Sequence, residues 1–429
     1  MTLSEKDKNF IWHPYTQMKD AFPNIVIERG EGAYLFDENG NRYIDAVSSW
    51  WVNLHGHSHP YLKEAINKQF AKIEHVIFAG FTHAPAVNLA EKLLAHLPEN
   101  QSKIFFSDDG STAVEVALKM ALQYWHNKDE KKTKLVALEG AYHGDTFGAM
   151  STSSRSAFTA PFQSFLFEVE FVDFPSDDSE TLVQLERLFA KGDVAAFIFE
   201  PLLQGTAGMK IYSPELLGNM LALCKKYNVL SIADEVFTGF YRTGKFFACD
   251  YQREQPDIFC MSKGLTGGVM PLGVTTCSEK NYEAFLSDGS DKVKTFFHGH
   301  SYTANPLACA VAVASIELLE NAETQKNIQR IIEKHKAFAE KLWLLDYARS
   351  DNNVKEVRHL GTILAIELAG ESGYFSKMRN ESYQFFISKG ILIRPLGNVI
   401  YLVPSYCISD EDLDYIYRAI VEIIEKLND

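Results

Sequence analysis

A lysine, an aspartate and a glycine-serine turn each follow an apolar run of this sequence, at positions where their chemistry could be used. Lys263 follows the run DIFCMS, Asp234 ends the run VLSIAD, and Gly110 and Ser111 follow the run KIFFS. A lysine in apolar surroundings loses its proton more readily, which a Schiff-base nucleophile requires. A buried carboxylate needs a cation such as a protonated pyridine nitrogen, and a turn of small residues that opens a helix can hold a phosphate. The three together predict a site for a phosphorylated pyridine cofactor.

Each of these signals has a plainer interpretation when it is taken alone. The segment Asp108–Thr112 could be an ordinary helix N-cap, Asp234 could form a structural salt bridge, and a single lysine is usually a surface residue. Tyr142 follows the run KLVAL and could stack on a planar cofactor, although an aromatic residue in a loop more often serves packing. The order of phosphate turn, strand-end aspartate and strand-end lysine is what favours the cofactor site.

Three histidines at alternate positions, His55, His57 and His59, resemble a set of metal ligands. No cysteine or carboxylate follows them at a spacing typical of zinc sites, and most such clusters are hydrogen-bonded turns. We therefore expect no metal ion at these histidines.

The elements that must position the candidate residues alternate between strands and helices. Between Gly56 and Ser301, helical patterns such as Thr112–Trp125 separate the apolar runs KIFFS, KLVAL, AAFIFE, VLSIADE, DIFCMS and LGVTTCS. Several runs are apolar on both faces, as strands of a covered parallel sheet are. The pattern predicts an α/β domain with a mostly parallel sheet, whose ligands bind beyond the carboxyl ends of the strands.

The two ends of the chain differ from this middle part. Gly32–Asp45 holds two short strand patterns around an Asn-Gly turn, which predicts a hairpin. After Pro306 we expect helices over Leu307–Glu320, Thr324–Trp343 and Asp410–Lys426, and strands near 362–367, 391–394 and 399–403. These elements predict a smaller α+β domain that shares a layer with the hairpin. The expected divisions are 1–55 for the N-terminal segment that packs with the small domain, 56–305 for the large domain and 306–429 for the small one.

The composition limits the partners of this chain of 429 residues, which is long enough for two domains. A net charge of −14 argues against nucleic acid and against an anionic membrane surface. No apolar run approaches the roughly 20 residues that span a bilayer, and the first residues lack the apolar stretch of a secretory signal. The six cysteines are scattered, as in a reduced protein. We expect a cytoplasmic location, small-molecule substrates, and neither nucleic acid nor membrane as a partner.

Six segments give the chain its likeness to a known family: FFSDDGSTAVEVALKMAL, GAYHGDTFGAMS, FEPLLQGTAGM, IADEVFTGFYRTGKFFACD, PDIFCMSKGLTGG and HSYTANPLACA. Over nearly its whole length the sequence resembles the class III aminotransferases that depend on pyridoxal 5′-phosphate (PLP). The resemblance implies the type I fold of PLP-dependent transferases, with a large, mostly parallel-sheet domain and a smaller α+β domain. It also implies PLP as the cofactor and a homodimer with active sites at the interface.

The resemblance assigns roles to the residues that match the family's motifs. Lys263 would form the Schiff base and shuttle the proton, Asp234 would pair with the pyridine nitrogen, and Tyr142 would stack on the ring. The residues expected at the cofactor are Gly110, Ser111, Tyr142, Asp234, Lys263, His300 and Ser301, of which Ser301 would serve the neighbouring subunit. Those expected at the substrate are Tyr15, Trp50, Lys263, Gly299, Arg394 and Tyr401, with Asp145 and Arg242 as supporting residues.

Four segments, one of them part of a segment named above, indicate one branch of the class: WHPYTQM, SSWW, RTGKFFACD and IRPLGNVIYLVPSY. Members of this branch convert 8-amino-7-oxononanoate to 7,8-diaminononanoate in biotin synthesis, usually with S-adenosylmethionine as the amino donor. The resemblance implies the same reaction here. Arg394 would bind the carboxylate of the long keto acid, since the planar guanidinium suits a carboxylate bidentately.

Two departures from the family patterns keep alternatives open. The segment QGTAG carries Thr206 where ornithine and 4-aminobutyrate aminotransferases carry a glutamate, which weakens the alternative of a broader ω-amino-acid:pyruvate aminotransferase. HGHSY carries His300 where much of the branch has proline, which leaves lysine open as the donor. A PLP-dependent mutase or epimerase is a third alternative. A non-catalytic protein of the same fold is the last, and the intact Lys263 and Asp234 argue against it.

Overall fold

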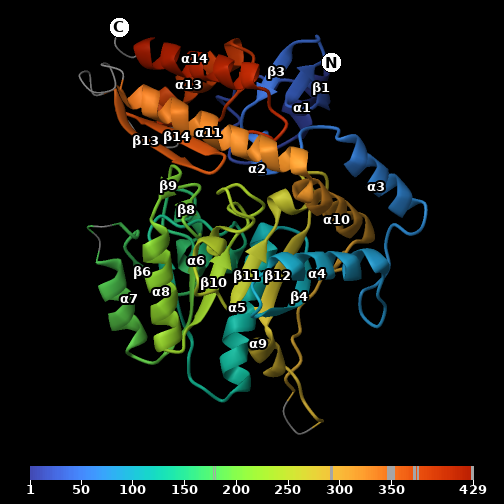
Figure 1. Cartoon of the computed structure of the whole chain (residues 1–429), viewed down its shortest axis with the longest axis vertical. Helices are drawn as coiled ribbons and strands as arrows, with labels where there is room; N and C mark the ends of the chain where they lie inside the picture. Colours follow the sequence, from blue (N-terminus) through green and yellow to red (C-terminus); the bar gives the residue numbers. More distant parts are fainter. Residues whose placement is uncertain are drawn as a thin grey trace.

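The computed structural model describes residues 1–176, 178, 180–289, 293–344, 353–370, 373 and 376–426 of the chain. In this part of the chain the strands form four sheets, ordered β4-β12-β11-β10-β7-β5-β6, β1-β2-β3-β15, β13-β14-β16 and β8-β9. Figure 1 shows the large sheet in the lower part of the view and the sheets built from the two ends of the chain above it. The first and the last residues that the structure describes lie at this upper end.

The largest sheet contains all six predicted apolar runs. Its strands are β4 (Gln101–Ser107), β12 (Gly273–Ser278), β11 (Ile258–Met261), β10 (Leu230–Asp234), β7 (Val194–Phe199), β5 (Lys134–Leu138) and β6 (Glu170–Val172). β12 is antiparallel to both of its neighbours, and the remaining described neighbours pair in parallel. The predicted mostly parallel α/β sheet is therefore confirmed. The three residues of β6 are an additional strand, too short to stand out as an apolar run.

Both faces of this sheet are covered, which explains why its strands are apolar throughout. Along β11, Ile258 and Cys260 belong to the core that includes the buried face of α5 (Gly110–Asn127). Phe259 and Met261, which point to the opposite face, belong to the core that includes α8 (Pro214–Lys226). Burying each such side chain contributes about 1.5–3 kcal/mol to the free energy of folding. The two covered faces therefore stabilise the sheet whose edge carries the candidate residues.

Helices account for most of the regular secondary structure outside the large sheet in the described residues. The α-helices of the described part are α1 (Leu3–Phe10), α2 (Ser48–Trp51), α3 (Pro60–Phe70), α4 (Ala84–His96), α5, α6 (Phe147–Thr152), α7 (Thr181–Phe189), α8, α9 (Glu279–Glu283), α10 (Pro306–Glu320), α11 (Ala322–Leu344), α13 (Lys377–Ser388) and α14 (Asp410–Lys426). Short 3₁₀ turns are η1 (Ala160–Phe165), η2 (Ala248–Tyr251) and η3 (Lys263–Thr266). In the described residues, we find no helix with both the length and the apolar character needed to cross a membrane.

The two ends of the chain meet in one sheet. β2 (Tyr34–Asp37) and β3 (Arg42–Asp45) form the predicted hairpin, and β1 (Ile27–Glu31) pairs with β2. The C-terminal strand β15 (Ile391–Leu392) pairs in parallel with β3. The remaining strands are β13 (Val354–Leu360), β14 (Ile363–Leu368), β16 (Val399–Leu402), β8 (Leu203–Gln204) and β9 (Lys210–Ile211). The helices expected after Pro306 are confirmed as α10, α11 and α14, whereas the domain boundaries near residues 55 and 305 stay a prediction.

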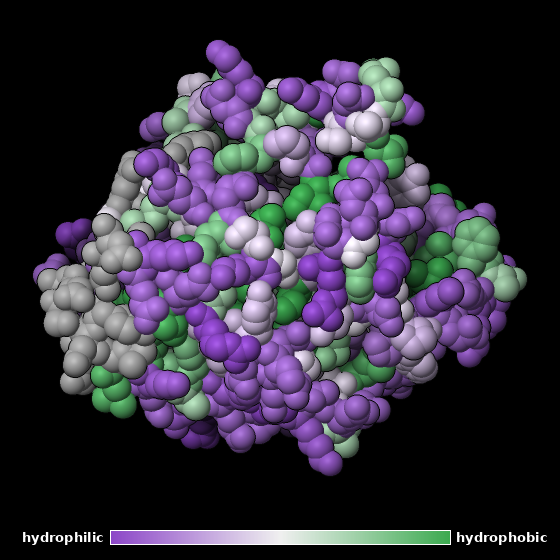
Figure 2. Space-filling view, turned by 90° about the horizontal axis from the view of Figure 1, so that it is seen from above, coloured by the Kyte–Doolittle hydropathy of each residue, from purple (hydrophilic) through white to green (hydrophobic). Residues whose placement is uncertain are grey.

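The face formed by these terminal elements is mostly hydrophilic, with hydrophobic side chains interspersed near its middle (Figure 2). Such a surface fits the charged fraction of 23% in the sequence.

Candidate active site

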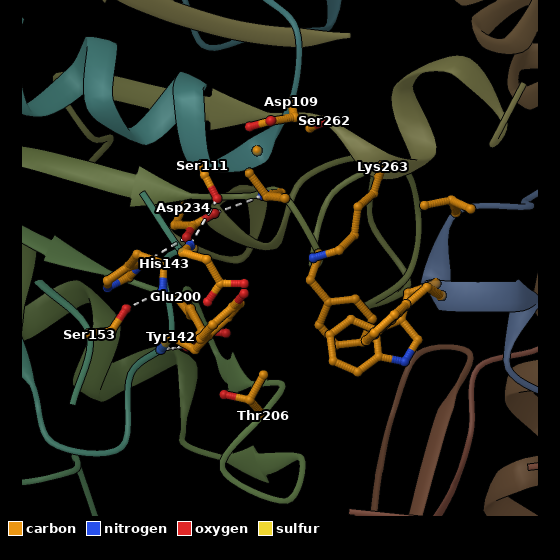
Figure 3. Close-up of a pocket in the computed structure, with 18 of the residues that line it drawn as sticks. Asp109, Ser111, Tyr142, His143, Ser153, Glu200, Thr206, Asp234, Ser262 and Lys263 are labelled. Atoms are coloured by element: carbon orange, nitrogen blue, oxygen red, sulfur yellow. Dashed lines mark hydrogen bonds and ion pairs between the residues drawn. The ribbon is translucent and has the colours of Figure 1, made fainter. Parts of the chain in front are cut away.

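A cavity of about 810 Å³ lies at the carboxyl ends of the large sheet's strands. Figure 3 shows that Lys263 reaches into it from one side, with Asp234, His143, Glu200 and Tyr142 on the other. The predicted site residues that line the cavity are Tyr15, Trp50, Gly110, Ser111, Tyr142, Asp145, Asp234, Lys263, Arg394 and Tyr401. Residues from both ends of the chain and from its middle thus converge on one space.

Lys263 begins the turn η3 directly after strand β11. Its backbone has φ +42°, a left-handed conformation that a non-glycine residue adopts at an energetic cost and that is common at functional sites. The amine nitrogen Nζ lies 5.1 Å from the centroid of the Trp51 ring and 5.8 Å from that of Phe237. Burial lowers the pKa of Lys263, partly offset by the nearby carboxylates of Asp234 and Glu200. A lowered pKa increases the fraction of the amine that is neutral and nucleophilic at a given pH.

Asp234 ends strand β10 and is held in place by a buried histidine. Its Oδ2 lies 2.7 Å from His143 Nδ1, and its Oδ1 accepts a hydrogen bond from the Val236 N–H at 3.1 Å. Asp234 is 5% exposed, so a positive partner in the cavity would stabilise its charge strongly. His143 Nε2 is buried and has no hydrogen-bond partner in the described residues. The sequence pattern had not singled out His143 as a site residue, although it adjoins Tyr142.

Glu200 is a second buried carboxylate that the sequence analysis missed. Its Oε1 accepts the Tyr142 N–H and its Oε2 accepts the Gly205 N–H, both at 3.0 Å. Burial raises the pKa of Glu200 to about 7. One side chain therefore ties two loops of the cavity wall together. The available signal was the run AAFIFE, which ends in a carboxylate as VLSIAD does.

The turn before α5 serves both as a helix cap and as a cavity wall. Asp109 accepts the Thr112 N–H at 2.8 Å while Thr112 Oγ1 accepts the Asp109 N–H at 3.0 Å, so the N-cap interpretation is correct and the Thr112 hydroxyl is used within the cap. Gly110 and Ser111 remain on the cavity surface. A Cβ on Gly110 would lie only 2.7 Å from Val236 Cγ1, so the backbone at position 110 can approach the Val236 side chain this closely only because the residue is glycine. The helix N-terminus and this close-running turn fit an anionic group such as a phosphate.

The N-terminal segment contributes Tyr15 to the opposite wall. The Tyr15 hydroxyl donates a hydrogen bond to the Asp145 carboxylate and lies 3.1 Å from the hydroxyl of Tyr142. Asp145 in turn donates its N–H to Ser111 Oγ at 3.1 Å, which connects this wall to the α5 turn. Burial raises the pKa of the Tyr142 hydroxyl, with the Tyr15 hydrogen bond as the next contribution. Tyr142 therefore stays neutral at physiological pH.

Two aromatic residues of α2 continue the wall toward the C-terminal strands. The guanidinium carbon of Arg394 lies 5.3 Å from the centroid of the Trp50 ring. Trp51 Nε1 donates a hydrogen bond to the Tyr401 hydroxyl at 3.2 Å. A cation beside aromatic surface suits a substrate that has a carboxylate on a long apolar chain.

Four predicted residues lie outside this cavity. Arg242 is buried behind the wall, where its guanidinium donates to the carbonyl oxygens of Pro404 at 2.6 Å and Trp51 at 3.4 Å. It supports the wall through backbone groups. Gly299, His300 and Ser301 belong to a separate turn in which the His300 N–H donates to Thr303 Oγ1 at 3.1 Å. The role expected for Ser301 in a neighbouring subunit stays a prediction, as does any role of Gly299 and His300.

The three alternating histidines each have a partner of their own. His55 Nε2 lies 3.0 Å from Ser315 Oγ, and His57 Nε2 lies 2.8 Å from Asp45 Oδ2. His59 is the N-cap of α3 and accepts the Tyr61 N–H at 3.3 Å. Across the described ranges, no group of three or more histidines, cysteines or carboxylates is placed to hold a metal ion.

Known proteins resemble this chain over nearly its full length. Residues 15–424 match the family Aminotransferase class-III. Adenosylmethionine-8-amino-7-oxononanoate aminotransferase from Synechococcus elongatus is 46% identical, over 97% of this chain and 99% of its own length. The crystal structure of the protein of that name from Methanocaldococcus jannaschii has a TM-score of 0.92 and 39% identity, covering 99% of this chain and 98% of that one. An amine transaminase from an uncultivated Pseudomonas species, in its PLP-bound form, has a TM-score of 0.89 and 28% identity, with 97% and 98% covered.

Proposed function

The chain belongs to the class III aminotransferases, and from this membership we propose that it transfers an amino group to 8-amino-7-oxononanoate, giving 7,8-diaminononanoate in biotin biosynthesis. The proposed amino donor is S-adenosylmethionine. The observation that carries the proposal is the convergence of Lys263, Asp234 and the N-terminus of α5 on one cavity. The high identity to relatives of that named activity, over their full length, supports the choice of substrates.

Class III aminotransferases depend on PLP, and the residues of this cavity fit that cofactor. When bound, PLP supplies an electron sink that stabilises the negative charge left when a proton leaves carbon. In our proposal Asp234 holds the protonated pyridine nitrogen, and His143 keeps that carboxylate oriented. Gly110 and Ser111 hold the phosphate at the N-terminus of α5. Tyr142, whose backbone Glu200 fixes, packs against the ring.

Lys263 is the residue proposed to bond the cofactor and to move protons. Because burial lowers the pKa of its amine, more of the lysine is in the neutral form that can accept a proton and later release it. Its place at the end of β11, opposite Tyr142 and Glu200, lets it reach the centre of the cavity (Figure 3).

The proposal includes a homodimer. Several large apolar side chains are exposed on the single chain, among them Trp12 at 87%, Phe297 at 75% and Tyr302 at 66%. Phe297 and Tyr302 flank the turn with Ser301, which supports an interface at that turn. The cytoplasmic location stays a prediction.

Replacing Arg394 by alanine should raise the apparent KM for the keto acid at least about 30-fold, because a desolvated carboxylate that loses its cation costs on the order of 2–5 kcal/mol. Steady-state kinetics with each substrate varied in turn measures this effect. A carboxylate-free amine donor should be nearly unaffected. Arg418→Ala, which removes an exposed arginine beside Tyr415, is the matched control and should behave like wild type. Equal losses for the keto acid and the carboxylate-free donor would contradict the assigned role of Arg394.

The amino donor is tested by mixing the PLP-loaded protein with one donor at a time and following the loss of its visible absorbance. S-adenosylmethionine should remove this absorbance, and subsequent 8-amino-7-oxononanoate should restore it. Loss of absorbance with lysine and not with S-adenosylmethionine would contradict the donor while leaving the keto substrate in place. Restoration by pyruvate and not by 8-amino-7-oxononanoate would instead favour the ω-amino-acid:pyruvate alternative.

A further inference from the structure

The amine of Lys263 faces two aromatic rings. Trp51 and Phe237 are 4% and 6% exposed, and their ring centroids lie 4.4 Å apart. Nζ lies within cation–π distance of both, at 5.1 Å and 5.8 Å. In the part of the chain that the structure describes, no hydrogen bond or ion pair of Nζ accompanies these contacts. In this structure the two rings are therefore the contacts described for the free amine of Lys263.

The position of Trp51 is fixed on several sides. Its Nε1 donates to the Tyr401 hydroxyl at 3.2 Å, and Arg242 donates to its carbonyl oxygen at 3.4 Å. Gly205 leaves room for both rings, since a Cβ there would lie 3.0 Å from Phe237 Cδ1 and 3.3 Å from Trp51 Cζ3. The pair of rings is thus a built part of the wall rather than a chance contact.

The backbone that carries Trp51 is strained. Ser48, Ser49 and Trp51 have φ values of +49°, +59° and +69°, a conformation that non-glycine residues adopt at a cost of order 1–3 kcal/mol each. Asp45 holds the turn, because its Oδ2 accepts the Ser49 N–H at 2.7 Å and lies 2.8 Å from His57 Nε2. One of the alternating histidines therefore supports the turn that places Trp51.

We propose that the faces of Trp51 and Phe237 form an aromatic seat that stabilises the protonated amine of Lys263 during transamination. The inference rests on the proposed function. In that reaction Nζ takes the proton that leaves the substrate carbon and later gives it up, so no proton is gained or lost over the cycle. Between these two events the ammonium group needs a stabilising partner, and the quadrupole of an aromatic face provides one in a desolvated site.

Other charged groups also act on Nζ. Asp234 and Glu200 favour its protonated form from the ends of β10 and β7, and burial opposes it. Asp234 also contacts His143 Nδ1, while Glu200 also accepts hydrogen bonds from two backbone N–H groups. Arg242 lies behind the Trp51 backbone. A substitution at Trp51 replaces none of these charged groups, but the smaller leucine also reduces the burial of Nζ. Reduced burial raises the pKa of Lys263 and loss of the aromatic face lowers it, so the direction of the shift distinguishes the two effects.

The test compares Trp51→Leu with Trp51→Phe in the full-length chain freed of cofactor. The rate of PLP uptake, followed by its visible absorbance, is measured against pH, because only the neutral amine of Lys263 reacts. Without the ring the ammonium form loses stabilisation, so the midpoint should move to lower pH by about one unit in Trp51→Leu. Trp51→Phe, which keeps an aromatic face, should stay within about 0.3 unit of wild type. In the loaded enzyme kcat should fall about tenfold in Trp51→Leu, with a smaller change in KM.

The outcomes separate this inference from the proposed function. A wild-type chain that takes up no PLP contradicts the proposed function. Normal uptake by wild type with an unchanged midpoint in Trp51→Leu, or with equal shifts in Trp51→Leu and Trp51→Phe, contradicts the aromatic seat alone. Thermal melting checks that each variant is folded. If Trp51→Leu does not fold, Phe237→Leu takes its place, and an unchanged midpoint in that variant likewise overturns the inference.

Discussion

Replacing Lys263 by alanine should abolish transamination, lowering turnover by at least about a thousandfold, the scale of a lost acid–base group together with a lost nucleophile. Among the described residues that line the cavity, Lys263 is the only lysine, so no other amine can take its place. The fold and the non-covalent binding of PLP should persist, because Asp234 and the α5 turn are unchanged. Turnover measurements, thermal melting and dialysis with radiolabelled or fluorescent cofactor distinguish these effects.

The matched control for this substitution is Lys63→Ala, which removes an exposed lysine of α3 outside the cavity. That variant should keep the activity of wild type. The Lys263→Ala protein should also lack the visible absorbance that arises when PLP is joined to an amine. Near-normal turnover in Lys263→Ala would show that the assigned lysine is not the reactive one.

Replacing Asp234 by asparagine should lower turnover by at least about a hundredfold with little change in structure, since the two side chains have nearly the same size. A neutral amide cannot stabilise a protonated pyridine nitrogen, so the ring would lose much of its capacity to accept electrons. The contact with His143, now 2.7 Å to a carboxylate oxygen, would become a hydrogen bond to an amide. Measured kcat and a changed visible spectrum of the bound cofactor are the two readouts.

Asp257→Asn is the control for the loss of a partly buried, hydrogen-bonded carboxylate beside the same sheet. Asp257 precedes β11 and accepts hydrogen bonds from the N–H and hydroxyl of Ser231, away from the cavity. Its replacement should lower thermal stability while kcat stays close to wild type. Comparable losses of kcat in both variants, or no loss in Asp234→Asn, would contradict a catalytic role for Asp234.

The local sequence was sufficient to select Asp234 and Lys263 as strand-end candidates, and both line the cavity. Asp234 and Lys263 follow apolar runs, and in a mostly parallel sheet the carboxyl ends of such runs meet at one edge. Covered strands are apolar on both faces, which made β7, β10 and β11 visible without tertiary information. The turn before α5 could also be predicted from local sequence, because a helix cap depends on residues within a few positions of one another.

Contacts between distant segments were decided only by the tertiary structure. Tyr15 donates a hydrogen bond to Asp145, which lies 130 positions later in the sequence, and Trp51 donates one to Tyr401, 350 positions later. No periodicity or turn pattern encodes such a pairing, because it depends on how two independently folded elements pack. Glu200 is a similar case, since its role depends on the N–H groups of Tyr142 and Gly205, which lie 58 and 5 positions away and come together only in the folded chain.

The placement of the histidines and of Trp51 has the same physical origin. His57 looked like part of a metal-binding pattern, yet its partner is Asp45, and together they hold a strained turn. Positive φ values at Ser48, Ser49 and Trp51 run against the preferences of these residue types, so local sequence predicts another conformation. The sequence by itself indicated six of the seven strands of the large sheet and the candidates Asp234 and Lys263 at two of their ends, because strand burial and helix caps depend on neighbouring residues. The folded chain decided which aromatic faces and carboxylates surround the amine of Lys263, because packing across long sequence distances overrides local preference.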